Sequence, residues 1–172
     1  TQYYLKRTLL EYRLAGVDKD AATRKRVQQL SDQITKISLI FGRNVQQSVN
    51  TVTVADKAEL DGLPADYIAD HKPAADGTIK LTTNFPDMMP VMTYAKSAKL
   101  RHEMFLAYST RAYPANKQVL LDLLKTRQEL ATTLGFKHWS DLATADQMIG
   151  SAANVRSFLA QLDTASKAPA DR

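Results

Sequence analysis

RVQQLSDQITKISLIFGRNVQQSV, residues 26–49, carries the clearest periodicity in the chain. Apolar residues recur there at intervals of three and four, namely Val27, Leu30, Ile34, Ile37, Phe41, Val45 and Val49. This spacing is typical of an amphipathic α-helix, which would be on the order of 45 Å long at 1.5 Å per residue. We expect Asp18 or Asp20 to cap it, and Ile34, Ile37 and Phe41 to be buried. A coiled coil is the less favoured alternative, because Asn44 interrupts the heptad.

The segments on both sides of this helix also show helical patterns or helix-ending signals. Gly16 and Gly135 follow apolar-periodic runs, as C-cap residues do. The sequence predicts further helices over residues 3–16, after Pro64, from Ser97 to 112, over 116–134, over 139–148, and from Ser151 onward. The last of these has an apolar face made of Val155, Phe158, Leu159 and Leu162.

Two short segments alternate with a period of two and are rich in β-branched residues, as strands are. They are NTVTVAD, residues 50–56, and DGTIKLTTNF, residues 76–85. Because a two-stranded ribbon is marginal alone, we expect residues 51–54 and 78–82 to pair antiparallel and to lie on the helices. Pro86 and Pro90 are expected to bracket a compact Met-rich turn. The predicted fold class is therefore mainly α: a helical, bundle-like region with one long helix and a small two-stranded antiparallel β-ribbon.

Composition narrows the class of protein further. The chain has 172 residues, of which 44% are hydrophobic and 24% charged, enough for one domain with a core. It contains no cysteine, so disulfides and thiolate metal sites are excluded. The net charge of +5 would permit an acidic partner, but the densest basic run, Arg24–Arg26, is expected to be a solvated helix face rather than a nucleic-acid patch. No apolar run reaches the roughly 18 residues of a membrane span.

One short motif suggests metal chemistry. LRHEMFL, residues 100–106, contains His102 and Glu103, the first half of the H-E-x-x-H of zinc peptidases, in which two histidines one turn apart bind the metal and the Glu is the general base. The second histidine is missing, because Leu106 stands in its place. His71 and His138 lie in unrelated segments, so a three-ligand site is not expected. We predict that His102 and Glu103 are ordinary helix-surface residues.

An ordered set of blocks resembles the thimet oligopeptidase family of zinc metallopeptidases, which includes oligopeptidase A and bacterial peptidyl-dipeptidases. The blocks are ELDGLPADYI (59–68), DGTIKLTTNFPDMMPVMTYA (76–95), LRHEMFLAYSTRA (100–112) and LLKTRQELATTLGFKHWSDL (123–142), preceded by FGRNV (41–45). The physical roles of these blocks are mostly structural: Gly62-Leu63-Pro64 forms a turn into a helix, and Tyr108 and Arg111 are expected to serve packing and ion pairing rather than catalysis.

The resemblance implies that residues 1–172 form a single helical region, part of the channel wall of a larger zincin-type peptidase that cleaves short peptides. It implies zinc in the parent enzyme, a cytoplasmic location, and a zinc-binding helix further along the chain than Arg172. We therefore expect no catalytic residue and no metal ligand here, no bound zinc, and no activity from this piece alone, with substrate-binding residues and oligomeric state unknown. No nucleic acid or membrane partner is expected. The alternatives are a non-catalytic helical interaction scaffold and, less favoured, a basic nucleic-acid-binding module.

Overall fold

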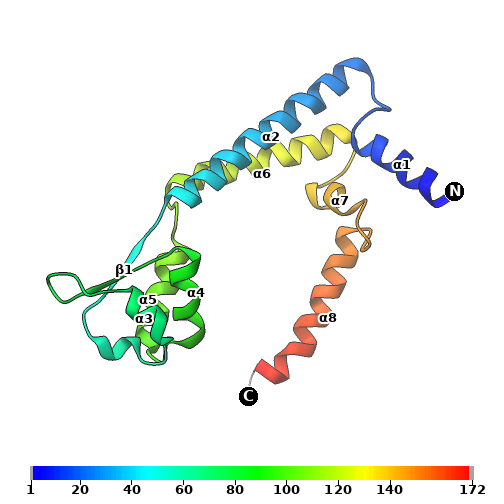
Figure 1. The fold of residues 1–172 in the computed structure, drawn as a ribbon. Helices are drawn as coiled ribbons and strands as arrows, with labels where there is room; N and C mark the ends of the chain where they lie inside the picture. The colour runs from blue at the N-terminus through cyan, green and yellow to red at the C-terminus, as the bar shows by residue number, and fades with distance from the viewer. Residues whose placement is uncertain (1, 171–172) are drawn as a thin grey trace. The chain divides into compact units, whose positions relative to one another are not determined.

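The computed structural model describes residues 2–170 (Figure 1). Its elements are, in chain order, α1 (Gln2–Leu14), α2 (Ala21–Gln47), β1 (Thr51–Val54), the 3₁₀ helix η1 (Lys57–Leu60), α3 (Ala65–Asp70), β2 (Ile79–Thr82), α4 (Phe85–Tyr94), α5 (Ala98–Ser109), α6 (Ala115–Leu134), α7 (Trp139–Thr144) and α8 (Ala152–Ala170). The mainly helical fold class is confirmed. The chain divides into two compact units, one formed by residues 40–119 and the other by residues up to 39 and from 120 onward.

The predicted β-ribbon is present in the unit of residues 40–119. Strands β1 and β2 pair antiparallel, with Val52 opposite Leu81 and Val54 opposite Ile79. All four of these side chains are buried, whereas Thr51, Thr53 and Lys80 are exposed. The alternation therefore directs one face of the ribbon into a core, and the prediction of two adjacent antiparallel strands is confirmed.

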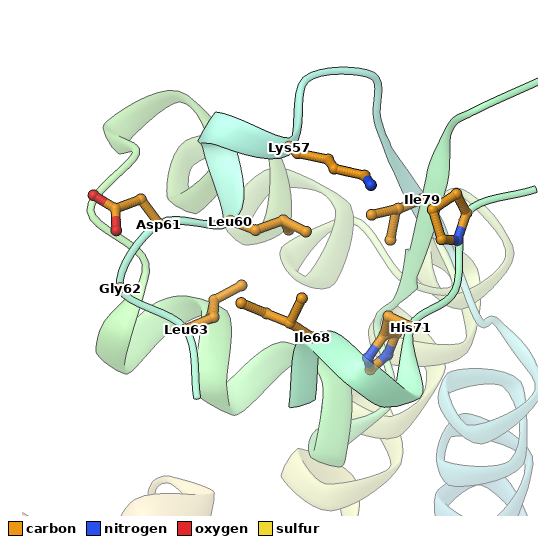
Figure 2. A pocket seen from close by; sticks show the side chains of 9 residues that line it. Lys57, Leu60, Asp61, Gly62, Leu63, Ile68, His71 and Ile79 are labelled. Carbon is orange, nitrogen blue, oxygen red and sulfur yellow. The ribbon is translucent and has the colours of Figure 1, made fainter. Parts of the chain in front are cut away.

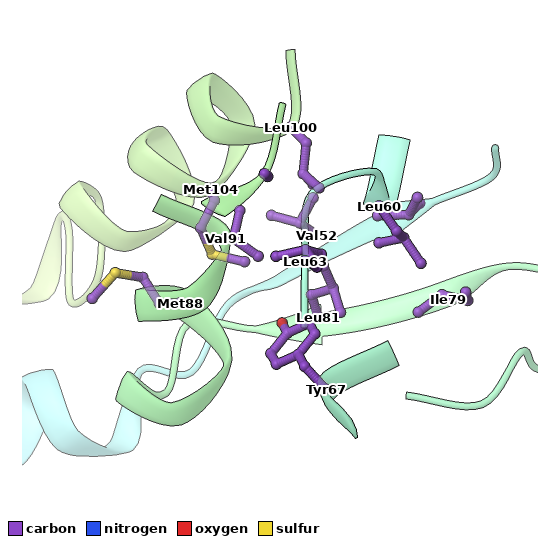
Figure 3. Packing of buried hydrophobic residues seen from close by; sticks show 12 residues of the cluster. Val52, Leu60, Leu63, Tyr67, Ile79, Leu81, Met88, Val91, Leu100 and Met104 are labelled. Atoms are coloured by element: carbon purple, nitrogen blue, oxygen red, sulfur yellow. The ribbon is translucent and has the colours of Figure 1, made fainter. Parts of the chain in front are cut away.

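The core of this unit lies between the ribbon and the helices α4 and α5. Leu81, Val91, Leu100 and Met104 have no exposed surface. Figure 3 shows Val91 and Met104 from the helices meeting Val52 and Leu81 from the ribbon, with Tyr67 of α3 on the other side of Leu81. Leu100 and Met104 are four residues apart, so they share one face of α5. Tyr108, one turn further on, has an exposed fraction of 36%.

The predicted compact turn between Pro86 and Pro90 was wrong, because α4 runs through both prolines. Pro86 lies in the first turn of the helix, where a backbone N–H has no intrahelical acceptor and its absence costs no hydrogen bond. Only Pro90 removes an intrahelical bond, the one to the carbonyl of Pro86. Burial of Met88 and Val91 against the ribbon and α5 offsets that cost.

The second unit is built around residues 21–39 of α2 and residues 120–134 of α6. Buried Val27 and Leu30 pack with Leu130, Ala131 and Leu134, and Figure 1 shows the two helices running side by side. Arg26 of α2 also forms an ion pair with Glu129 of α6. The short helix α7 adds Leu142 to this cluster, with Trp139 packed against it.

The predicted burial of three residues on the long helix was wrong. Ile34, Ile37 and Phe41 are only half-buried. Ile34 packs at the margin of the cluster around Leu30. The stripe is narrow and a single long helix runs beside it, so part of each side chain stays in contact with solvent.

Local signals at the helix ends act largely as expected. Asp20 is the cap of α2, because its carboxylate accepts bonds from the Thr23 amide at 2.9 Å and from the Thr23 hydroxyl. Ser151 accepts from the Asn154 amide at 3.1 Å and so caps α8. Helix α7 ends at Thr144, four residues before the predicted end. In the described part of the chain, none of the helices is both long and apolar enough to cross a membrane.

Candidate functional site

His102 and Glu103 lie on the outer surface of α5. His102 is exposed, and Leu106, one turn later, is 47% exposed. Glu103 pairs with Lys99 at 3.9 Å, an i,i+4 contact on the same helix. This is the environment of ordinary helix-surface residues.

The other two histidines are found in different settings. His138 is exposed and precedes α7 as its N-cap residue, without a capping bond from its side chain. His71 ends α3 and faces Asp87 of α4. Among residues 2–170, no three His, Asp or Glu side chains converge in a way that could hold a metal ion.

The basic run at the start of α2 is largely occupied by contacts within the protein. Arg24 donates to the carbonyl oxygen of Lys19 at 2.9 Å. Arg26 is paired with Glu129. These contacts favour the solvated helix face over a nucleic-acid patch.

Tyr108 and Arg111, which belong to the family-like block at 100–112, act in packing. The Arg111 guanidinium lies 4.2 Å from the centre of the Tyr108 ring, a cation–π contact. It also faces the carbonyl oxygen of Thr83, a fully buried residue, at 3.4 Å. The Thr83 hydroxyl accepts from the backbone N–H of Asn50 at 2.9 Å. The side-chain amide of Asn50 donates to the backbone carbonyl of Ala107 at 2.7 Å. The group joins the end of the ribbon to α5, and Arg111 meets a ring and a carbonyl rather than a carboxylate.

A polar cluster lies between α3, β2 and α4. The Tyr67 and His71 rings stack with their centres 4.2 Å apart. His71 Nδ1 is 2.8 Å from the carbonyl oxygen of Tyr67 and Nε2 is 3.3 Å from Asp87 Oδ1. The other Asp87 oxygen accepts from the Thr82 amide at 3.0 Å and from the Thr82 hydroxyl. Because a carbonyl can only accept, Nδ1 carries a proton.

Burial and hydrogen bonding have opposing effects on the acid of this cluster. Burial acts to raise the pKa of Asp87, but the bonds from Thr82 and the charge of His71 outweigh it, so the pKa lies below its ordinary value. The pKa of the Tyr67 hydroxyl is raised, chiefly by burial and then by the Asp87 charge. That hydroxyl donates to the backbone carbonyl of Asp87 at 2.8 Å. Tyr67 is therefore a neutral donor, and the cluster fastens α3 to α4.

A hollow of about 410 Å³ lies beside this cluster. It is lined by Lys57, Leu60, Asp61, Gly62, Leu63, Ile68, His71, Pro73 and Ile79. Figure 2 shows Leu60 and Ile68 facing one another across the space, with Ile79, Lys57 and His71 at one end and the Asp61 carboxylate pointing away. The hollow therefore combines apolar walls with the Lys57 ammonium group and the His71 ring at one end.

Sequence reasoning missed both the cluster and the hollow. Tyr67 and His71 are four residues apart on one helix, which is a readable stacking signal. The partner Asp87 could not be found in the same way, because it lies within the segment predicted as a turn. The hollow brings together η1, α3, β2 and the segments that connect them, and no periodicity in the sequence indicates how these pieces are placed.

Comparison with known proteins relates most of the chain to one group of peptidases. Residues 91–171 match the model of Peptidase family M3. Saccharolysin of Saccharomyces cerevisiae is 30% identical over 165 residues, which cover 92% of this chain and 23% of that protein. Oligopeptidase A of Escherichia coli is 30% identical over 168 residues, covering 90% of this chain and 25% of that protein. A probable thimet oligopeptidase of Arabidopsis thaliana is 26% identical over 161 residues, covering 94% of this chain and 22% of that protein. The chain thus spans about a quarter of the length of the curated relatives it matches.

Proposed function

We propose that this chain, which belongs to the thimet oligopeptidase family, is a non-catalytic section of a zinc-dependent oligopeptidase that hydrolyses short peptides. The observation that carries the proposal is the 30% identity to saccharolysin and oligopeptidase A across at least 90% of the chain. That similarity covers most of the chain, so it is not confined to one short motif.

The structural duties of the family-like blocks support a scaffolding role. Gly62 adopts a positive φ of 92°, and a Cβ atom there would collide with the carbonyl oxygen of Tyr94. The turn at 62–64 is therefore built for close packing. Arg111 and Thr83 hold the ribbon to α5, as described above. We assign to residues 1–172 the role of one wall of a channel that admits short peptides and excludes folded proteins.

The zinc of the parent enzyme requires ligands that the described residues do not offer. A catalytic zinc takes three protein ligands and one open position for water. The side chain one turn beyond His102 is that of Leu106, and among residues 2–170 no acidic or histidine cluster completes a site. When bound, zinc would activate a water and polarise the scissile carbonyl. We place its ligands, and the Glu general base, beyond Arg172.

A non-catalytic interaction scaffold is the second candidate, and α8 gives it a specific observation. Phe158, Leu159 and Leu162 of its apolar face are each more than half exposed. A face of this kind suits packing against further protein, which a peptidase parent or a scaffold partner could equally provide.

The coding sequence beyond Arg172 separates the two candidates. The peptidase assignment requires H-E-x-x-H and a third Glu ligand about one helix later. Replacing the Glu of that motif by Gln in the complete protein should abolish peptide cleavage while bound zinc is kept. A complete reading frame without the motif would favour the scaffold.

A further inference from the structure

We propose that the hollow between η1, α3 and β2 is a binding site for a small carboxylate with a branched apolar group, such as an acylated leucine or the C-terminal residue of a peptide. The proposal does not rest on zinc or on catalysis, because the groups that would contact the ligand all lie within residues 57–79 and none has been given a catalytic role.

The walls supply the apolar part of the site. Leu60, Leu63 and Ile79 are at most 7% exposed and form buried walls, while Ile68 stands opposite with 39% of its surface exposed. A volume of about 410 Å³ falls within the range of small-molecule pockets, roughly 300–1,000 Å³. An aliphatic group placed between Leu60 and Ile68 would remove the exposed part of Ile68 from water.

Three acids near the hollow already have partners. Asp61 pairs with Lys96 at 3.1 Å, and its carboxylate points away from the space. Glu59 pairs with Lys99 at 2.8 Å. Asp87 faces His71 and accepts from Thr82.

Lys57 is the lysine that lines the hollow, and its charge is not used in an ion pair within residues 2–170. In the described part of the chain its ammonium group has no carboxylate partner, and Figure 2 shows it at the same end of the hollow as Ile79. Both nitrogens of His71 are engaged, one by the Tyr67 carbonyl and one by Asp87, so His71 offers the ligand no free donor. The three N–H donors of Lys57, at one end of the apolar walls, suit a carboxylate.

The loop that closes one side is held in place before any ligand arrives. Gly62 occupies a conformation that L-residues rarely adopt. The Lys96 amide donates to the carbonyl oxygen of Asp61 at 2.8 Å, which ties the loop to the α4–α5 connection. Binding would therefore require little ordering of the backbone.

The test is an NMR titration of the ¹⁵N-labelled 172-residue chain with N-acetyl-leucine and with N-acetyl-leucinamide. The two probes share the apolar group and differ in the carboxylate. We expect shifts at the amides lining the hollow, with the amide probe binding on the order of tenfold more weakly, as the loss of one charge-assisted hydrogen bond implies.

Two variants place the charge. Lys57→Gln should reduce the affinity for N-acetyl-leucine to the affinity that the unaltered chain has for N-acetyl-leucinamide. Lys80→Gln, on the exposed face of the ribbon, should leave the affinities for both probes unchanged. Equal affinity for the two probes in the unaltered chain would overturn the proposal, as would shifts that avoid residues 57–79 or an unchanged preference in Lys57→Gln. The comparison of probes needs no substitution, so it stands even if a variant fails to fold.

Discussion

Asp87→Asn tests the polar cluster that fastens α3 to α4. The carboxylate accepts from the Thr82 amide and hydroxyl and faces His71. Hydrogen bonds to a charged group contribute about 1.5–3 kcal/mol each. Asn keeps one oxygen acceptor, so part of the network survives. We therefore expect a net loss of about 1–3 kcal/mol in the free energy of local opening.

The Thr82 amide gives a direct readout, because its N–H points at Asp87 Oδ2 at 3.0 Å. A loss of this size should speed its hydrogen exchange by roughly 5- to 150-fold, at about 1.4 kcal/mol per factor of ten. Asp70→Asn is the matched control, since Asp70 is exposed at the end of the same helix α3 and should leave exchange at Thr82 unchanged.

The pH dependence follows from the direction of the Asp87 shift. Its pKa is lower in the folded chain than in the unfolded one. The stabilisation is therefore complete above the unfolded value, about 3.9, and is lost as pH falls through the folded value. The difference in stability between the parent chain and Asp87→Asn should shrink as pH falls below about 4. Exchange at Thr82 that is the same in both proteins at neutral pH would refute the role given to this cluster.

Three further substitutions test the packing. Met104→Ala removes a side chain without exposed surface and should cost roughly 2–5 kcal/mol in urea unfolding followed by circular dichroism; a cost below 1 kcal/mol would contradict its place in the core. Phe41→Ala should cost roughly half of the 3–5 kcal/mol typical of a fully buried Phe, because Phe41 is only half-buried, and a loss of the full 3–5 kcal/mol would contradict its partial exposure. Gly62→Ala should lower the free energy of unfolding by about 1–3 kcal/mol through backbone strain and the clash with Tyr94. Gly77→Ala, at a positive φ but with open space around it, should lower it less. Equal losses would show that the clash contributes nothing.

The elements that follow a strict period could be predicted from the sequence. The alternation of Val52 and Val54 with exposed threonines identified the ribbon and its buried face. The three-and-four spacing of Val27 and Leu30 identified the long helix. Local periodicity succeeds at these places because the direction of each side chain depends on its position along its own helix or strand.

The parts that depend on distant neighbours could not be predicted in this way. Phe41 continues the apolar stripe, yet its burial depends on how much of that stripe is covered. Pro86 and Pro90 carry strong turn signals, but burial of Met88 and Val91 overrides them. Lys57 becomes a candidate ligand contact only because the acids beside it are paired elsewhere: Glu59 with a lysine of α5, and Asp61 with a lysine just before α5. No pattern in residues 57–61 indicates these pairs.

The most direct test of the central claim is zinc content measured together with peptide cleavage. The purified 172-residue chain, shown by circular dichroism to be folded, would be dialysed against zinc, assayed for bound metal, and incubated with a quenched short peptide. The longer polypeptide to which we assign it would be treated in parallel. We predict one zinc per molecule and chelator-sensitive cleavage for the longer polypeptide, and neither for the 172-residue chain. One equivalent of tightly bound zinc in the 172-residue chain, with cleavage lost on His102→Ala, would contradict the account and make LRHEMFL an active site.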